Sequence, residues 1–151
     1  MKTPRKSGVA TLANPLATRL GYQLRRASVL MMADLDTRLA PTGLRPAELT
    51  ILLLIGANSG CRQGEVGDML GIKRSNMVPL IANLMSKGLV ARTRTDGRST
   101  ALSLTAKGRA MALSGNRLID RHEAVFRARL DSRALDSLLA ALATLNGQVE
   151  V

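Results

Sequence analysis

The sequence predicts a mainly α-helical fold, in which two short helices and a β-hairpin in the middle of the chain are flanked by longer helices. Apolar residues make up 46% of the 151 residues, which is enough for a core, but aromatic side chains are nearly absent. A core of Leu, Ala, Met, Ile and Val suits helix packing better than a β-sandwich. Residues 62–104 add the order helix, glycine, helix, glycine and hairpin. This order predicts a helix-turn-helix followed by a β-wing.

The first part of this segment has the spacing of two amphipathic helices. Within residues 64–70, apolar side chains stand at i, i+3 and i+4, which gives the helix one buried face. Gly71 can adopt a positive φ at little cost, so it can end this helix and turn the chain. The second helix is expected over residues 74–87, with Gly88 as its C-terminal stop. Its predicted core-facing residues are Met77, Leu80, Ile81 and Leu84.

Pro79 departs from the pattern of an ideal second helix. Proline has no N–H, and this one lies too deep to be the first helical residue if the helix begins at Arg74. Two arrangements are open: a distorted first turn that frees the Ser75 carbonyl, or a regular helix that begins closer to Val78. We expect the helix to survive with a local kink.

Two strand-like runs complete the segment, over residues 89–94 and 99–104. Asp96-Gly97 between them is a strong hairpin signal, because both loop positions of a type I′ turn need positive φ. Asp96 is the only acidic residue of this hairpin. Its basic residues are Arg92, Arg94 and Arg98. A basic β-ribbon beside a helix-turn-helix is suited to reach the backbone or the minor groove of DNA.

Three segments carry a resemblance to a known family. They read GLRPAELTILLLI at 43–55, GEVGDMLGIKRSNMVPLIANLMSKGLV at 64–90 and RTDGRSTALSLTAKG at 94–108. In this order they resemble the MarR family of bacterial winged-helix regulators. The last segment is similar to the family's wing signature, a D-x-R arrangement followed by a Leu-Thr-x-x-Gly run. Val78 and Pro79 depart from the family, since many members carry a polar or basic residue in the middle of the recognition helix.

The resemblance implies how the chain is divided. A winged helix-turn-helix lobe of three helices plus the β-hairpin wing is expected at residues 44–104. Long dimerisation helices are expected at 15–40 and 105–147, where they would form an intertwined dimer. Residues 1–14 are polar and basic, so we expect a flexible arm that is either a solvated tail or a contact to phosphate.

The outer helices carry wide apolar stripes. One helix is expected over residues 15–39, with an apolar face broader than a single partner helix requires. After the wing, a helix capped by Thr105 is expected to reach about residue 129, and Asp131 or Ser132 then caps the last helix. The leucine stripe of this last helix is either core or dimer contact.

The charge of the chain indicates a polyanionic partner. Lys and Arg number 22 against 11 acidic residues, a net charge of +11, which favours nucleic acid first and an anionic membrane second. Between residues 73 and 109, eight basic residues stand against one acid. The alternative for this excess is a solvated surface with extra lysines and arginines. One of the eight, Lys87, suits the negative end of the helix dipole, and a phosphate contact is a further hypothesis for it. We predict a homodimer that binds a near-palindromic double-stranded operator.

Candidate DNA contacts lie on the second helix and on the wing. Arg74 can donate to a guanine edge or a phosphate, Ser75 can bind phosphate, and Asn76 can pair with adenine. Arg98 is the candidate for minor-groove insertion, and the resemblance implies that Asp96 orients it. The predicted DNA-binding residues are Lys73, Arg74, Ser75, Asn76, Val78, Pro79, Arg92, Arg94, Asp96 and Arg98.

The resemblance further implies a repressor that responds to a ligand. In this family a small effector, often an aromatic acid or phenolic compound and sometimes a thioester, binds between the dimerisation helices and the winged lobe. Such an effector acts only if it binds the two states of the protein differently. The candidate effector-binding residues are Tyr22, Arg25, Arg26, Met31 and His122. The two arginines can meet a carboxylate or simply face solvent, and a lone histidine is most often a packed, hydrogen-bonded residue.

Other functions have less support in the sequence. Cys61 would act as a redox switch if it were exposed and had a lowered pKa, to which Arg62 can contribute; an ordinary small residue is the alternative. A winged helix that binds structured RNA is also open, although the scarcity of aromatic residues argues against stacking on single strands. No constellation of residues points to an enzyme, a cofactor or a metal. The lack of a long apolar run or signal sequence predicts a cytoplasmic protein without membrane contact.

Overall fold

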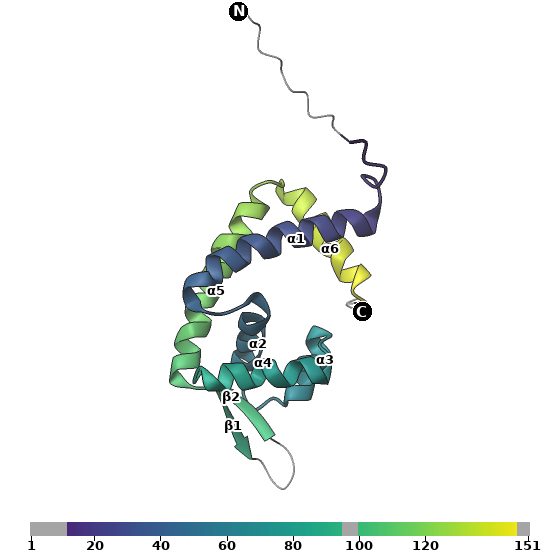
Figure 1. Ribbon diagram of the computed structural model, residues 1–151. Coiled ribbons are helices and arrows are strands. Elements are labelled where there is room, and N and C mark those ends of the chain that lie inside the picture. Colours follow the sequence, from purple (N-terminus) through teal and green to yellow (C-terminus); the bar gives the residue numbers. More distant parts are fainter. Residues whose placement is uncertain (1–11, 95–99, 148–151) are drawn as a thin grey trace, which may run out of the picture.

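The computed structural model describes residues 12–94 and 100–147. Helices α2, α3 and α4 and the β1–β2 hairpin form one lobe, and α5 extends from it to the outer helices (Figure 1). The predicted mainly α-helical fold with a central hairpin is confirmed. The elements are α1 (Leu20–Leu39), the 3₁₀ turn η1 (Ala40–Thr42), α2 (Pro46–Ala57), α3 (Gln63–Leu70), α4 (Arg74–Ser86), β1 (Val90–Arg94), β2 (Thr100–Leu104), α5 (Ala106–Arg127) and α6 (Ser132–Leu145).

The core of the winged lobe is centred on α2. This helix is apolar over most of its circumference and buries Leu49, Ile51, Leu52 and Ile55. The buried residues of α4 are Met77, Ile81 and Leu84. They belong to the stripe that the sequence spacing predicts, whereas Leu80 of the same stripe is only half-buried. The inward face of α4 is therefore fixed by hydrophobic burial against α2 and the hairpin.

Glycine determines how closely α3 and α4 pack. Gly71 has φ +63°, and α3 ends there as predicted. Gly67, inside α3, lies against the following turn: a Cβ on it would stand 3.1 Å from the Ile72 carbonyl oxygen and 3.3 Å from Met77 Cγ. Because Gly67 has no side chain, α3 packs closely against the backbone of the turn and against the Met77 side chain of α4.

Helix α4 continues through Pro79. It begins at Arg74, so the predicted survival of the helix is confirmed and the alternative start near Val78 is wrong. Pro79 offers no N–H to the carbonyl of Ser75, four residues earlier. Both residues are exposed, so water can satisfy that carbonyl and the proline is tolerated.

The hairpin is antiparallel and agrees with the predicted strands. Its register pairs Val90 with Leu104 and Arg94 with Thr100. The segment before α3 adds to the free edge of β2, where Arg62 forms a bridge with Ala101. The predicted turn at Asp96-Gly97 lies outside the described residues.

The first helix begins at Leu20 rather than at Pro15, so the predicted start is wrong. The cause is Asn14, whose Oδ1 accepts a hydrogen bond from the Leu16 N–H at 3.0 Å and closes a separate turn. Arg19 then has extended backbone, with ψ 121°. The helical hydrogen bonds can therefore start only after it.

Helix α5 lies directly on the winged lobe. Thr105 caps it, as predicted, by accepting a hydrogen bond from the Gly108 N–H at 2.9 Å. A Cβ on Gly108 would stand only 1.9 Å from the Leu89 carbonyl oxygen, and one on Gly115 only 2.3 Å from Leu49 Cδ1. These two glycines let the helix backbone touch the start of the hairpin and the side of α2.

A buried histidine joins α5 to α1. His122 is 2% exposed, and its Nδ1 lies 2.7 Å from Asp34 Oδ2. The Arg38 Nε donates to the same oxygen at 2.6 Å. Hydrogen bonds from Arg38 and then from His122 lower the pKa of the Asp34 carboxyl to about 2. The carboxylate therefore stays charged, and the link persists, until the pH falls through that value.

The outer helices leave apolar side chains uncovered. No residue of α6 is buried, and α1 buries only Leu35 and Leu39. The leucine stripe of α6 is therefore not part of the core of a single chain. Within the described part of the chain, no single helix has both the length and the apolar composition to cross a membrane. One bent pair, Leu20–Thr42 and Pro46–Ala57, meets both criteria when the two segments are taken together.

Gly108→Ala is expected to destabilise the fold, because the new methyl group would overlap a backbone oxygen. Overpacking of this kind costs about 1–3 kcal/mol of unfolding free energy. Gly21→Ala is the matched control in α1, since nothing lies within 4 Å of its added Cβ; it should be neutral or stabilise by up to about 1 kcal/mol. Urea unfolding followed by circular dichroism measures both. Equal midpoints for the two variants would contradict the close contact of α5 with the hairpin.

Candidate nucleic-acid interface

Helix α4 presents an exposed ridge of small side chains, which we call the α4 ridge: Ser75, Pro79, Ala82 and Ser86. At about 100° per residue, these positions point away from the buried side of the helix. Arg74 and Val78 stand on one flank of the ridge and Asn76 on the other, and all three are exposed. Small side chains at the crest let a helix backbone come close to base edges in a major groove.

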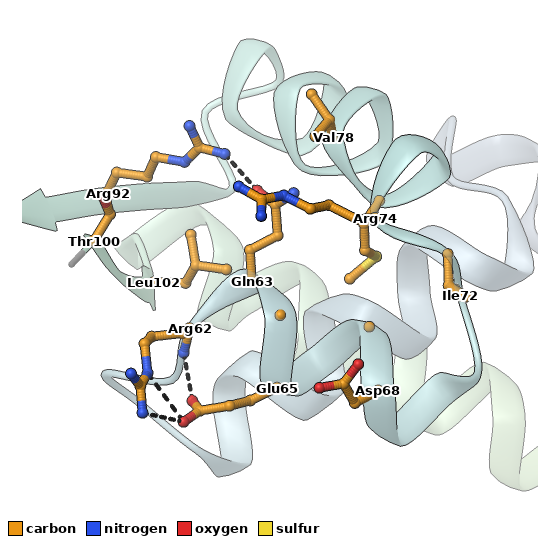
Figure 2. Close-up of a pocket in the computed structure, with 13 residues that line it drawn as sticks. Arg62, Gln63, Glu65, Asp68, Ile72, Arg74, Val78, Arg92, Thr100 and Leu102 are labelled. Atoms are coloured by element: carbon orange, nitrogen blue, oxygen red, sulfur yellow. Dashed lines mark hydrogen bonds and ion pairs between the residues drawn. The ribbon is translucent and has the colours of Figure 1, made fainter. Parts of the chain in front are cut away.

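A groove of about 720 Å³ lies between α3, α4 and the hairpin. We call it the wing groove. Figure 2 shows Arg74 extending from α4 and Arg92 extending from β1 toward each other across it, with Gln63 between them. Both arginines are exposed. Two guanidinium groups beside a protruding helix form a surface that attracts phosphate.

Gln63 positions one of these arginines. Its Oε1 accepts a hydrogen bond from Arg92 Nη2 at 2.6 Å. Gln63 is the first residue of α3 and is half-buried, so it directs the guanidinium over the wing groove while other N–H donors remain for a ligand. The sequence gives no sign of this role, because nothing in the local pattern links two positions that are 29 residues apart.

Arg62, at the edge of the wing groove, is engaged within the protein. Its backbone N–H donates to Glu65 Oε2 at 2.7 Å and its Nη2 to Oε1 at 2.9 Å. Hydrogen bonds from the backbone and then from the guanidinium of Arg62 lower the pKa of the Glu65 carboxyl. The pair is therefore charged and largely self-neutralised at neutral pH. Among the described lining residues, this leaves Arg74 and Arg92 as the cations that face a ligand in this groove.

A second groove, of about 660 Å³, lies on the other flank of α4. We call it the α2 groove, because its opposite wall is the start of α2. Its lining includes Arg45 on the α2 side and Asn76, Pro79 and Asn83 on the α4 side. The α4 ridge therefore stands between two hollows rather than beside one.

A buried carboxylate joins the walls of the α2 groove. Glu48 is 1% exposed and accepts hydrogen bonds from Lys87 Nζ at 3.1 Å, from Asn83 Nδ2 and from the Arg45 N–H at 2.8 Å. Burial raises the pKa of this carboxyl, but the donors, from Arg45 to Lys87 and Asn83, outweigh burial and hold the pKa below its usual value. Lys87 Nζ also donates to the Gly43 carbonyl at 2.8 Å.

The surroundings of Lys87 favour a structural role over the hypothesised phosphate contact. The three donors of its ammonium group have acceptors inside the protein, on Gly43 and on both oxygens of Glu48. Two further cations each make one hydrogen bond to a neutral carbonyl, which directs the side chain but leaves its charge in place. Lys107 Nζ donates to the carbonyl of Lys87 at 2.8 Å, and Arg109 Nη1 to that of Leu104 at 3.0 Å. The basic excess in the sequence overstates the charge that is free to meet a ligand, because Lys87 and Arg62 are paired with carboxylates.

The other predicted contacts are distributed around α4 and the wing. Lys73 immediately precedes α4 and is exposed. Arg94 is the last residue of β1, two positions after Arg92. Asp96 and Arg98, the predicted wing-tip pair, lie outside the described residues. The structure thus brings Arg74 and Arg92 to one groove and places Asn76 at the other.

Comparison with known proteins identifies the family. A sequence model described as the MarR family matches residues 42–99, which run from the last residue of η1 through β1 and end just before β2. The HTH-type transcriptional repressor Rv2887 of Mycobacterium tuberculosis is 32% identical over 123 residues, which cover 80% of this chain and 83% of the relative. The chain belongs to the MarR family.

Solved structures of MarR-family relatives share the fold. The transcriptional repressor CouR, bound to a 23-mer DNA duplex, is 40% identical, with TM-score 0.82 over 87% of this chain and 94% of that chain. CouR bound to p-coumaroyl-CoA is 39% identical, with TM-score 0.80 over the same shares. Rv2887 in complex with p-aminosalicylic acid is 26% identical, with TM-score 0.70 over 85% of this chain and 99% of that chain. The MarR-family chain is a DNA-binding transcriptional regulator.

Cys61 does not have the surroundings of a redox-active thiol in this MarR-family chain. It is half-buried beside a groove of about 460 Å³ that Val66 and Met69 also line. Burial, and next the Glu65 carboxylate, raise the pKa of the thiol, which is opposite to what a reactive thiolate needs. The expectation that Arg62 lowers this pKa is wrong, because that guanidinium pairs with Glu65.

The candidate effector residues fall into separate groups in the single chain. Tyr22 lies under Arg26, whose guanidinium carbon is 5.8 Å from the ring centre. Arg25 is exposed and Met31 is half-buried on the same helix. His122 has the packed, hydrogen-bonded surroundings that are usual for a lone histidine on an apolar stripe. None of these five residues lines the wing groove or the α2 groove.

Lys87→Ala is expected to lower the stability of the fold, whereas Lys73→Ala is expected to lower the affinity for DNA. Removing Lys87 leaves the buried Glu48 carboxylate without its cation and should lower the unfolding free energy by about 1–3 kcal/mol. Lys73→Ala should leave stability within about 0.5 kcal/mol of the wild type, while it weakens DNA binding. Urea unfolding and fluorescence anisotropy with a labelled duplex separate the two properties. Unchanged stability of Lys87→Ala would show that the ion pair does not hold α4 in place.

Proposed function

We propose that this MarR-family regulator is a sequence-specific repressor that binds double-stranded DNA as a homodimer and is released by a small aromatic effector. One observation carries the DNA-binding part of the proposal. The exposed α4 ridge stands beside a groove over which two arginines, Arg74 and Arg92, extend from opposite walls. This arrangement presents a helix to the major groove and cations to the adjoining phosphates.

The residues have different roles in this arrangement. Arg74 donates to a guanine edge or a phosphate, Ser75 binds phosphate, and Asn76 pairs with an adenine edge. Lys73 and Arg92 supply phosphate contacts, while Val78 and Pro79 give apolar contact to bases such as the thymine methyl group. On the wing, Arg94 and Arg98 approach the backbone and the minor groove, and Asp96 orients Arg98.

The homodimer is supported by the uncovered faces of the outer helices. Apolar side chains on α1, α5 and α6 that stay exposed in the single chain need a partner surface. A second copy of the chain is the occupant that a two-fold operator requires, with two α4 helices about 34–36 Å apart. The exposed large apolar residues of these helices are Leu20, Leu24, Val29, Leu30, Met32, Leu113, Val125, Leu138, Leu139 and Leu145.

The effector class is supported by what the relatives bind. CouR binds p-coumaroyl-CoA, the thioester of a phenolic acid, and Rv2887 binds p-aminosalicylic acid. We assign to this chain an aromatic acid, a phenolic compound or a thioester of one. Arg25 and Arg26 would meet the carboxylate or phosphate of the effector, and Tyr22 and Met31 would meet its ring. His122 would hold the adjoining turn of α5 through its bond to α1.

Asn76→Ala tests direct base recognition. The variant should lose about 1–3 kcal/mol of binding free energy at one base position of the operator and little affinity for random duplex. Asn116→Ala is the matched control, because it also removes an exposed amide from a helix, here α5. Fluorescence titrations with operator duplexes changed one base pair at a time give both values. An equal loss on operator and random DNA would remove Asn76 from base recognition.

Effector release is tested by a gel shift on the DNA upstream of the gene for this chain. Aromatic acids and their coenzyme A thioesters should release the duplex in proportion to concentration, whereas acetate and acetyl-CoA should not. Arg25→Ala and Arg26→Ala together should raise the concentration needed for half-release roughly tenfold, with unchanged DNA affinity. If no aromatic compound released the DNA, the effector class would be wrong and the DNA-binding proposal would stand.

A further inference from the structure

The α4 ridge divides the DNA-facing surface into two grooves of similar size. The wing groove, of about 720 Å³, runs along the flank that carries Arg74 and Val78. The α2 groove, of about 660 Å³, runs along the flank that carries Asn76 and Asn83. About 100° of rotation per residue separates these flanks to either side of the ridge. The helix that would enter DNA therefore has one groove along each of its flanks.

Duplex DNA has a matching two-sided shape. A major groove is about 12 Å wide and admits one helix. It is bounded by the phosphate backbones of the two strands, one on each side of the inserted helix. A protein ridge with a hollow on each flank fits this shape, since each hollow can receive one of the backbones. The wing groove and the α2 groove would then face opposite strands.

Among the residues that the structure describes, the α2 groove has one cation in a position to bind such a backbone. Lys87 lines it, but its ammonium group is engaged by Glu48 and Gly43. Arg45 also lines it and is exposed. Within residues 12–94 and 100–147, the Arg45 guanidinium takes part in none of the ion pairs.

The acid of the α2 groove does not oppose a phosphate there. The Glu48 carboxylate is buried, and three hydrogen-bonding partners and the Lys87 charge compensate it. Asn76 and Asn83, on the opposite wall, are neutral. The Arg45 guanidinium therefore supplies the accessible positive charge of the α2 groove. Arg74 and Arg92 supply the accessible positive charge of the wing groove.

We propose that Arg45 binds a backbone phosphate of the DNA strand opposite to the strand that Arg92 contacts. The inference rests on the proposed function, because it requires α4 to enter a major groove. The two contacts hold α4 from both sides and so set its depth and its rotation about its own axis. The contact from Arg45 is independent of sequence, but it fixes the register in which Asn76 meets a base edge.

The first measurement is the salt dependence of binding. Wild type and Arg45→Gln are titrated with an operator duplex selected by the wild type from a random pool, and with a random duplex. Arg45→Gln should weaken binding to both by about three- to tenfold at low ionic strength. The slope of log K against log salt should fall by about 0.9 for each phosphate that the variant no longer neutralises. Arg45→Lys should keep the slope, and Arg117→Gln, which removes an exposed arginine from α5, should change neither value.

The second measurement identifies which DNA strand carries the phosphate that Arg45 contacts. Single phosphates of the selected operator are replaced by neutral methylphosphonates, and each duplex is titrated with wild type, Arg45→Gln and Arg92→Gln. The phosphate that matters to wild type but not to Arg45→Gln is the partner of Arg45. It should lie across the major groove from the phosphate found in the same way for Arg92.

The outcomes separate the inference from the function on which it rests. Normal affinity and slope for Arg45→Gln, or partner phosphates on the same strand, would overturn the two-strand contact while leaving a DNA-binding regulator. Failure of the wild type to bind any duplex would overturn the proposed function itself. Thermal melting of each variant by circular dichroism guards against a folding defect, and a variant that melts early is replaced by Arg45→Lys paired with Arg45→Met.

Discussion

The orientation of α4 depends on one buried carboxylate. Glu48 lies near the start of α2, while the ammonium and amide groups that bind it come from the end of α4. A buried charge without these donors would cost several kcal/mol, so the cluster strongly disfavours other placements of α4. Among the described residues, every buried side-chain nitrogen or oxygen has a hydrogen-bond partner. Hydrophobic burial brings the two helices together, and the carboxylate decides how they are aligned.

Helix α5 transmits this alignment to the rest of the chain. At Gly108 and Gly115 its backbone rests on the hairpin and on α2. Further along the same helix, His122 is bonded to Asp34 of α1. A rotation of α1 must therefore either break this buried bond or carry α5 with it. An effector that alters the outer helices can thus reposition α4 through a rigid element rather than through a flexible linker.

Features that depend on neighbouring residues could be predicted from the sequence. Gly71 ends α3 because a positive φ is needed there, and Thr105 caps α5 because its hydroxyl can reach an N–H three residues later. The same local chemistry explains one error. Asn14 closes its own turn with Leu16 and delays the first helix, and a stripe of apolar residues gives no sign of that competition.

Interactions between distant residues could not be predicted from the sequence pattern. Lys87 and Glu48 are 39 residues apart, so the local pattern presents Lys87 as a surface cation, although it supports the fold. Gln63 and Arg45 have no distinguishing local pattern, because their importance comes from the grooves in which they lie. The family resemblance indicates that the chain binds DNA, and charge alone favours the same class of partner. Only the packing distinguishes the cations that are free from those that are already engaged.

Pro79 has a consequence for the chemistry of the α4 ridge. Because it lacks an N–H, the Ser75 carbonyl oxygen has no donor from the next helical turn and stays available at the crest. The ridge therefore carries a hydrogen-bond acceptor that belongs to the main chain. Exchanging the side chain of Ser75, Ala82 or Ser86 leaves this acceptor in place, whereas exchanging the proline for a residue with an amide hydrogen would occupy it. Part of the hydration of the crest is in this way set by an imino acid, beside the hydroxyl groups of Ser75 and Ser86.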